Sequence, residues 1–141
     1  MTPVIIESPY AGNVETNVAY ARRCMVDCLK RGEAPFASHL LYTQVLDDTQ
    51  PGQRELGVQA GLVWGFRATL TVVYIDLGVS SGMIECIKAA VADCRDICVR
   101  SLDGWTVRCL DCDSYLHGLD RDYGCACKGA GYTVETMGVT P

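Results

Sequence analysis

The segment "TLTVVYID" (69–76) constrains the fold more than any other part of the chain. It is β-branched and apolar on both of the faces that a strand would present, so it predicts a strand that is buried on both sides. Strands of this kind occupy the centre of parallel sheets whose two faces are covered by helices. The segment therefore predicts a domain of the α/β class.

The rest of the first hundred residues alternates between short apolar runs and segments of helical periodicity. "SHLLYTQVLDDTQPGQ" (38–53) is expected to form a loop with local turns. We expect strands at 3–7, 33–37, 69–76 and 96–102, and helices from Asn13 to Gly32, from Pro51 to Trp64 and from Ser80 or Ser81 to about Ala92. The order β-α-β-α-β-α-β predicts a Rossmann-like (flavodoxin-like), doubly wound parallel sheet.

Charge and hydropathy exclude two classes of partner. A formal net charge of −5 argues against a surface that binds the phosphate backbone of double-stranded nucleic acid. No apolar run is long enough to cross a membrane, and the first residues do not have the pattern of a signal peptide. We therefore expect a cytoplasmic protein that binds no membrane.

Nine cysteines fall into two groups. Cys24, Cys28, Cys86, Cys94 and Cys98 lie in periodic segments and are expected to be mainly buried thiols. The second group is Cys109, Cys112, Cys125 and Cys127. Their paired spacing favours one structural zinc ion, and His117 could replace one thiolate. Two disulfides or unligated thiols are the alternatives.

The pattern of the chain changes after "SLDG" (101–104). Beyond this point Cys, Gly, Asp and Tyr dominate without helical periodicity, and so short a segment needs a metal or a disulfide to be stable. The sequence therefore predicts an α/β domain at 1–103 and a small Cys-rich appendage, a zinc-ribbon-like extension, at 104–141.

Ligands of doubly wound sheets bind at the carboxyl ends of the strands, where helix N-termini present free amides. The loops "ESPYAGN", "SHLL" and "DLGVSSGM" are expected to meet there. The candidate ligand-binding residues are Ser8, Tyr10, Asn13, His39, Asp76, Ser80, Ser81, Gly82 and Met83.

The motifs "SPYAGN", "PFASHLL", "LDD" and "SSGM" occur in an order that resembles the nucleoside 2-deoxyribosyltransferase-like superfamily, within it a poorly characterised, phage-rich branch. The resemblance extends over residues 3 to about 100. It implies a homo-oligomer and a pocket for a nucleoside or nucleotide. In characterised relatives a glutamate four positions after a Gly turn attacks or stabilises the anomeric carbon. Here that count leads from Gly82 to Cys86, whereas Glu85 is one position short, or about 100° away on a helix.

The resemblance also implies roles for three candidates. Asp76 would be aimed at the nucleoside, Ser80 would contact phosphate or ribose, and Tyr10 would lie near the sugar. His39 has no secure role in the family, but its loop position makes it a candidate general acid or phosphate donor.

Each of these residues also has a structural interpretation. Asp76 could cap a turn, Tyr10 could cover the sheet edge, and Ser80, Ser81 and Asn13 could be helix caps. His39 could be a hydrogen-bonded structural histidine, and Glu85 a solvated acid of the first helical turn.

Two functions follow from this pattern. The first is binding of a nucleoside or nucleotide without turnover, as in a phage protein that captures a nucleotide signal of host defence in the host cytoplasm. The second is an N-glycosidase or deoxyribosyltransferase in which Glu85 acts as nucleophile or stabiliser and His39 assists the leaving group. The displaced glutamate favours the first function.

Overall fold

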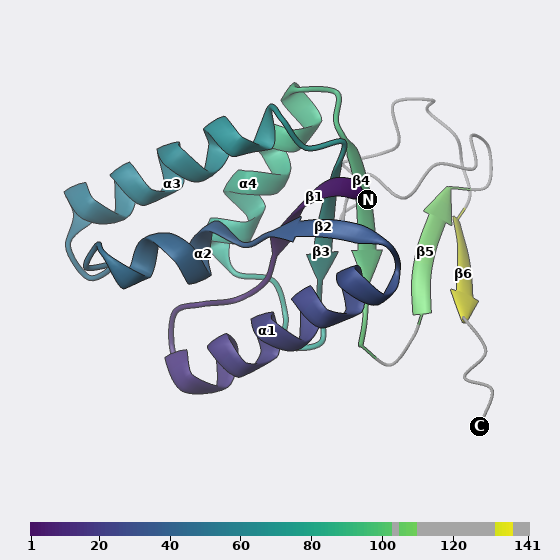
Figure 1. Ribbon diagram of the computed structural model, residues 1–141, viewed down its shortest axis with the longest axis horizontal. Helices are drawn as coiled ribbons and strands as arrows, with labels where there is room; N and C mark the ends of the chain where they lie inside the picture. The colour runs from purple at the N-terminus through teal and green to yellow at the C-terminus, as the bar shows by residue number, and fades with distance from the viewer. Residues whose placement is uncertain (103–104, 110–131, 137–141) are drawn as a thin grey trace.

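The sheet has six strands in the order β2-β1-β3-β4-β5-β6, as the computed structural model of the chain shows (Figure 1). The structure describes residues 1–102, 105–109 and 132–136. β2, β1, β3 and β4 are parallel, whereas β5 pairs antiparallel with both β4 and β6. The strands are β1 (Thr2–Glu7), β2 (Glu33–Phe36), β3 (Leu70–Tyr74), β4 (Asp96–Arg100), β5 (Trp105–Cys109) and β6 (Tyr132–Thr136).

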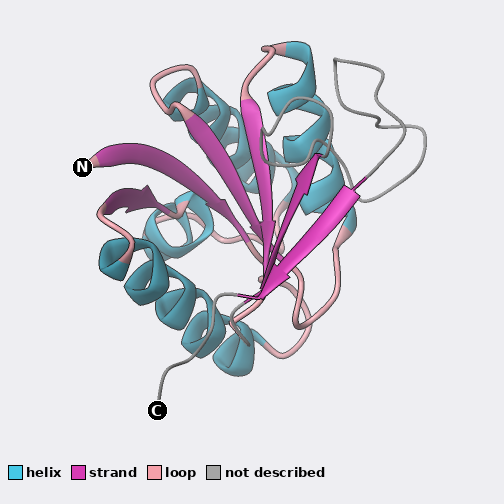
Figure 2. Ribbon diagram, turned by 90° about the vertical axis from the view of Figure 1, so that its right-hand side faces the viewer, coloured by secondary structure: helices cyan, strands magenta, loops and turns pink. Residues whose placement is uncertain are grey.

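Helices cover both faces of the parallel part of the sheet (Figure 2). α1 packs on one face, and α3 and α4 pack on the other. The helices are α1 (Val14–Lys30), α2 (Ser38–Leu41), the 3-10 turn η1 (Tyr42–Gln44), α3 (Pro51–Gly65) and α4 (Ser81–Ala92). The strand order β2-β1-β3-β4 with helices on both faces confirms the predicted flavodoxin-like, doubly wound sheet.

Side-chain alternation along β3 supplies both hydrophobic cores. Val72 and Tyr74 belong to the core beneath α1, whereas Val73 belongs to the core beneath α4. All five residues of β3 are buried, so the prediction of a central strand buried on both faces is confirmed. Cys24 and Cys28 of α1 are fully buried in the first core, which confirms their predicted role as core thiols.

Two parts of the fold differ from what we expected. The expected loop over 38–53 contains α2 and η1, where the hydroxyl of Thr43 donates to the carbonyl of His39 at 2.8 Å. After residue 104, β5 and β6 extend the same sheet beyond β4, and the sequence pattern did not predict them. The boundary between 103 and 104 stays a prediction. In the part of the chain that the structure describes, no helix is long and apolar enough to span a membrane.

Candidate functional site

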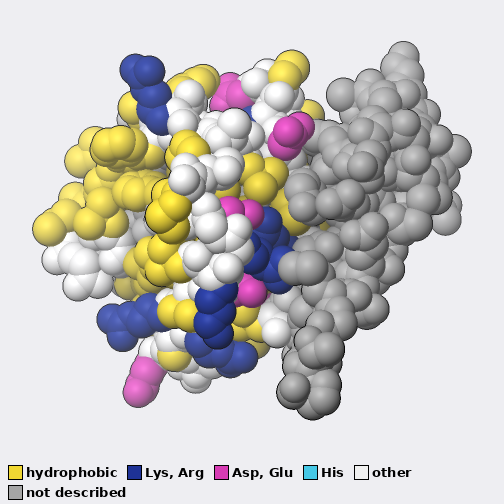
Figure 3. Space-filling view, turned by 45° about the vertical axis from the view of Figure 1, so that its right-hand side comes forward, with side chains coloured by type: hydrophobic (Ala, Val, Ile, Leu, Met, Phe, Trp, Pro, Cys, Tyr) yellow, Lys and Arg dark blue, Asp and Glu magenta, His cyan; other side chains and the backbone are white. Residues whose placement is uncertain are grey.

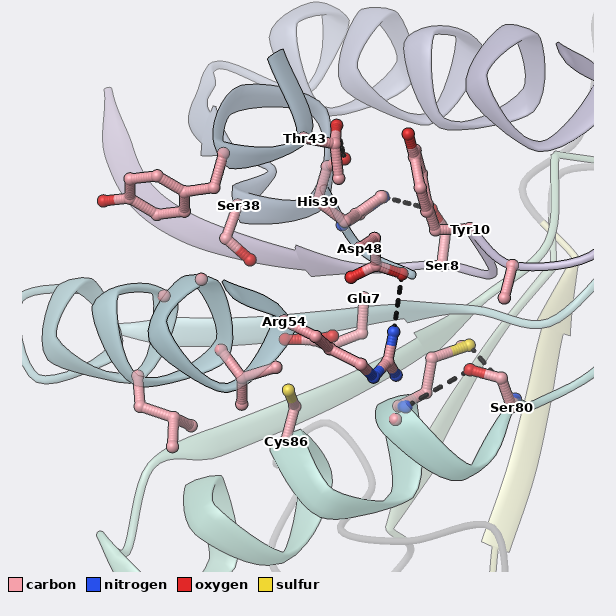
Figure 4. A pocket seen from close by; sticks show the side chains of 18 of the residues that line it. Glu7, Ser8, Tyr10, Ser38, His39, Thr43, Asp48, Arg54, Ser80 and Cys86 are labelled. Atoms are coloured by element: carbon pink, nitrogen blue, oxygen red, sulfur yellow. Dashed lines mark hydrogen bonds and ion pairs between the residues drawn. The ribbon is translucent and has the colours of Figure 1, made fainter. Parts of the chain in front are cut away.

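A cavity of about 150 Å³ lies on the face of the sheet that α3 and α4 cover (Figure 4). β1 forms its floor through Ile5 and Glu7, whose side chains alternate with the core residues Val4 and Ile6. α2, α3 and the first turns of α4 form its walls. Seven of the predicted ligand-binding residues line it: Ser8, Tyr10, His39, Ser80, Ser81, Gly82 and Met83.

Ser8 and His39 meet at the upper wall of the cavity as Figure 4 is drawn. Oγ of Ser8 lies 2.8 Å from Nε2 of His39, and the ring of Tyr10 packs edge-on against the imidazole with 6.4 Å between ring centroids. Burial lowers the pKa of His39 to about 4. At neutral pH the imidazole is therefore uncharged, so it can donate or accept a hydrogen bond but carries no positive charge.

The N-terminus of α4 forms the opposite wall. Oγ of Ser80 accepts from the backbone N–H of Met83 at 3.3 Å, which makes Ser80 the N-cap of α4. Arg54 reaches over this helix end, because a Cβ at Gly82 would lie 3.1 Å from its Nη2. Nη1 of Arg54 pairs with Oδ2 of Asp48 at 2.6 Å. Helix amides and a guanidinium therefore share this end of the cavity, an arrangement suited to an anion.

Glu85 and Cys86 point in different directions from α4. Cys86 lines the cavity, whereas Glu85 is exposed to solvent and does not line it. One residue of helix separates them by about 100°, as the sequence predicts. Burial and the carboxyl group of Glu7 raise the pKa of Cys86 to about 12, so it stays a thiol at neutral pH.

Sequence reasoning missed Glu7, the acidic residue that does enter the cavity. Only 8% of Glu7 is exposed. Burial raises the pKa of Glu7 to about 8, although the Cys86 thiol and the Arg95 guanidinium both favour the charged form. The alternation of side chains along a strand was the available signal, because Glu7 lies two residues after Ile5 and therefore on the same face of the sheet.

Three glycines of α3 also escaped notice. Gly57, Gly61 and Gly65 recur every four residues and all line the cavity, so one stripe of the helix presents no side chain to it. A Cβ at Gly61 would lie 2.8 Å from Oγ of Ser38, at the start of α2. These glycines therefore let α2 pack closely against α3 and leave space for the cavity beside the helix.

Asp76 and Asn13 lie outside the cavity. Asp76 accepts hydrogen bonds from the hydroxyls of Tyr20 and Ser101 and, at 3.1 Å, from the backbone N–H of Leu102. Burial acts to raise the pKa of Asp76, but these hydrogen bonds lower it. Oδ1 of Asn13 accepts from the N–H of Thr16 at 3.1 Å and caps α1. Asp76 thus joins the end of β3 to α1 and to the residues after β4, and Asn13 caps a helix.

The predicted zinc ligands Cys112, Cys125 and Cys127 lie outside the described residues, as does His117. Cys109 is the last residue of β5. Within residues 1–102, 105–109 and 132–136, no three His, Cys, Asp or Glu side chains come together to hold a metal ion. The zinc site stays a prediction.

Solved structures and a family model both connect this chain to known proteins. The fold is similar to that of a 2-deoxyribosyltransferase from the psychrotolerant bacterium Bacillus psychrosaccharolyticus, with a TM-score of 0.54 and 16% sequence identity over 71% of this chain and 72% of that one. This similarity shows the fold, while the superfamily resemblance and its phage-rich branch stay predictions. No curated protein matches the chain. Residues 2–100 match a family described as a domain of unknown function (DUF7768), and the chain belongs to that family.

Proposed function

We propose that this protein binds a nucleoside or nucleotide in the cavity and does not cleave its N-glycosidic bond. The cavity reaches the carboxyl end of β1 and the N-terminus of α4, which is where doubly wound folds bind such ligands. The similar solved structure is described as a biocatalyst for the synthesis of nucleosides. Fold and cavity position together support a ligand of this class.

The position of the Cys86 side chain is the main support for the absence of turnover. The superfamily resemblance puts the attacking carboxylate of relatives at this position, and here a protonated thiol lines the cavity instead. Glu85 faces solvent, so it cannot reach a sugar in the cavity without moving the helix. A misplacement of about 1 Å already costs about a hundredfold in rate.

The polar walls suggest how such a ligand would be held. Ser80, the first amides of α4 and Arg54 would bind a phosphate group. Ser8, Tyr10 and the neutral His39 on the opposite wall would contact ribose hydroxyls. Hydrogen bonding by uncharged groups suits a hydroxyl, whereas the helix end and the guanidinium suit an anion.

Glu7 favours the second candidate function, an N-glycosidase or deoxyribosyltransferase. It is a carboxyl group in the cavity beside Cys86 and is largely protonated at pH 7. In that role Glu7 would act as general acid on the departing base rather than as nucleophile. The cavity would then lack an attacking carboxylate, because Asp48 is engaged with Arg54.

The test is to release and identify what the protein carries. Heat-denatured protein is analysed by mass spectrometry, and the native protein is incubated with nucleosides, nucleoside monophosphates and nicotinamide dinucleotides. We expect an intact nucleotide and no free base. Base release that disappears in Glu7→Gln would establish the enzyme instead, and release that disappears in Glu85→Ala would contradict our assignment of that side chain. Absence of binding to any of these compounds would overturn both functions.

Self-association is a further part of the proposal, as the resemblance implies. Figure 3 shows hydrophobic side chains gathered on the side of the molecule where α2 and α3 lie. Exposed apolar residues there are Leu41, Val45, Leu56, Val63, Trp64 and Phe66. An apolar face of this kind favours a homo-oligomer, which light scattering of the purified protein would detect. A phage protein with this function would sequester a nucleotide signal of host defence.

A further inference from the structure

Arg95 lines the cavity beside the last residue of α3, whereas Arg54, in the first turn of that helix, lies beside the helix end that would hold a phosphate. It directly precedes β4, so its backbone is at the amino end of the parallel strands, opposite the edge where ligands are expected. Its guanidinium nevertheless lines the same cavity as Ser80 and Tyr10. The cavity therefore extends along the sheet from the N-terminus of α4 to Arg95.

The guanidinium of Arg95 is buried with two donors unused. Arg95 is 9% exposed, and its Nη2 lies 3.4 Å from Oδ2 of Asp93. Nε and Nη1 have no hydrogen-bond partner among the described residues. Among the described residues, three buried side-chain nitrogen or oxygen atoms have no hydrogen-bond partner, and two of them belong to Arg95; the third is Oγ1 of Thr71. Buried donors left unpaired are costly, which favours a ligand that pairs with them.

α3 leaves room for this side chain at its last residue. A Cβ built at Gly65 would overlap Nη1 of Arg95. The guanidinium thus occupies space that any other residue at position 65 would take.

The surroundings of Arg95 suit an uncharged ring better than a phosphate. Asp93 and the Glu7 carboxyl group are its charged and titratable neighbours, and Ile5, Val58 and Leu62 provide apolar walls. An anion would find the amides of α4 and Arg54 at the other end. A nucleotide placed with its phosphate there would direct its base toward Arg95.

We propose that Arg95 reads the base of the ligand by donating hydrogen bonds to the carbonyl oxygen of an oxopurine such as hypoxanthine or guanine. The inference rests on the proposed function and names its ligand class. Arginine donating to O6 and N7 of a purine is a frequent specific contact in nucleic-acid recognition. Adenine presents an amino donor at position 6 instead, and two donors facing each other are unfavourable.

The experiment compares inosine 5′-monophosphate with purine riboside 5′-monophosphate by isothermal titration calorimetry, because the second lacks the oxygen at position 6. We expect the wild-type protein to bind the first about 10- to 100-fold more tightly. Arg95→Met should abolish that difference. Arg54→Met is the matched control, since it removes a guanidinium at the other end and should weaken both ligands equally. Gly65→Ala displaces the Arg95 guanidinium while keeping its charge, and should abolish the difference as well.

The inference is overturned if the preference persists in both Arg95→Met and Gly65→Ala, or if Arg95→Met weakens both ligands equally as Arg54→Met does. The second result would assign Arg95 to the phosphate. Titrations with free hypoxanthine and free purine test this inference separately from the proposed function. Binding of hypoxanthine over purine without binding of nucleotides would contradict the nucleotide function and leave the role of Arg95 standing. Binding of none of the four compounds would contradict both.

Discussion

The carboxyl group of Glu7, at the end of β1, and the thiol of Cys86, on α4, are neighbours in the cavity (Figure 4). The thiol favours the charged form of Glu7, whereas the carboxylate raises the pKa of Cys86. Burial dominates both shifts, so both groups hold their protons at neutral pH. The cavity therefore has a carboxylic acid and a thiol where a transferase would need an anionic nucleophile.

Glu7 should make the folding stability fall as pH rises from 6.5 to 8. The pKa of Glu7 is about 4.5 in the unfolded chain and about 8 in the fold, so between these values the native state holds a proton that the unfolded chain has released. His39 acts in the opposite direction, but only between about 4 and 6.5, where the unfolded state is the more protonated one. Above pH 6.5 the effect of Glu7 dominates: stability falls by at most about 1.4 kcal/mol per pH unit, and this slope is about half as steep by pH 8. Urea denaturation across this range measures it.

Glu7→Gln is the variant that checks the assignment, because it keeps the shape of the side chain and removes the titration. Its free energy of unfolding should be nearly constant from pH 6.5 to 8. A slope equal to that of the wild-type protein would mean that another group titrates there.

Breaking the ion pair between Arg100 and Glu33 should cost more stability than breaking any other ion pair in the described residues. Nη1 and Nη2 of Arg100 donate to the two carboxylate oxygens at 2.7 and 2.6 Å, and the pair joins β4 to β2. Arg100 is almost fully buried and the Glu33 side chain is 13% exposed, so Arg100→Met leaves a largely buried carboxylate unpaired and should cost about 3–5 kcal/mol. Arg31→Met, which breaks the more exposed pair with Asp27, should cost about 1 kcal/mol or less. Equal losses in chemical denaturation would contradict this ranking.

Asp76→Asn should lower stability and leave ligand affinity unchanged. Its carboxylate joins the end of β3 to α1 and to the residues after β4, through Tyr20, Ser101 and Leu102, and does not line the cavity. Losing the charge should cost about 1–3 kcal/mol. Ser80→Ala is the comparison, because Ser80 lines the cavity and should lose affinity as well as about 1 kcal/mol of capping. Calorimetric titration of both folded variants separates the two effects, and weaker binding by Asp76→Asn would restore its predicted role.

Local patterns predicted the scaffold and one wall of the cavity. The apolar run of β3 and the Ser80 cap of α4 depend on neighbours in sequence, so periodicity and capping chemistry suffice to place them. The contacts of Glu7 and Arg95 depend on segments far apart in the chain, which no local pattern contains. Asp76 was predicted for the site from its strand-end position, but Tyr20 of α1 reaches that end of the sheet and engages it.

Zinc content tests the prediction for the tail. If Cys109, Cys112, Cys125 and Cys127 form one tetrahedral site, elemental analysis should give about one zinc per chain. Cys112→Ser and Cys127→Ser should release it and expose the tail to proteolysis, because metal binding is coupled to folding. Cys94→Ser is the control, since this exposed cysteine lies in the α/β domain. Metal-free protein with the four tail thiols oxidised in pairs would replace the zinc site by disulfides.

Restoring the missing carboxylate should give the cavity a weak activity on N-glycosidic bonds. Cys86→Glu places a second carboxyl group beside Glu7, and two carboxyls that share a buried site cannot both ionise. Because Glu7 already holds its proton at neutral pH, the new group is the one that can ionise and attack the anomeric carbon, while Glu7 protonates the departing base. We expect slow base release by Cys86→Glu, measured by chromatography, and none by Glu7→Gln combined with Cys86→Glu. Glu85→Ala in the Cys86→Glu background is the control that leaves the rate unchanged. If Cys86→Glu binds nucleoside but releases no base, the cavity does not present the sugar to position 86, and the correspondence with the catalytic glutamate of the superfamily is wrong.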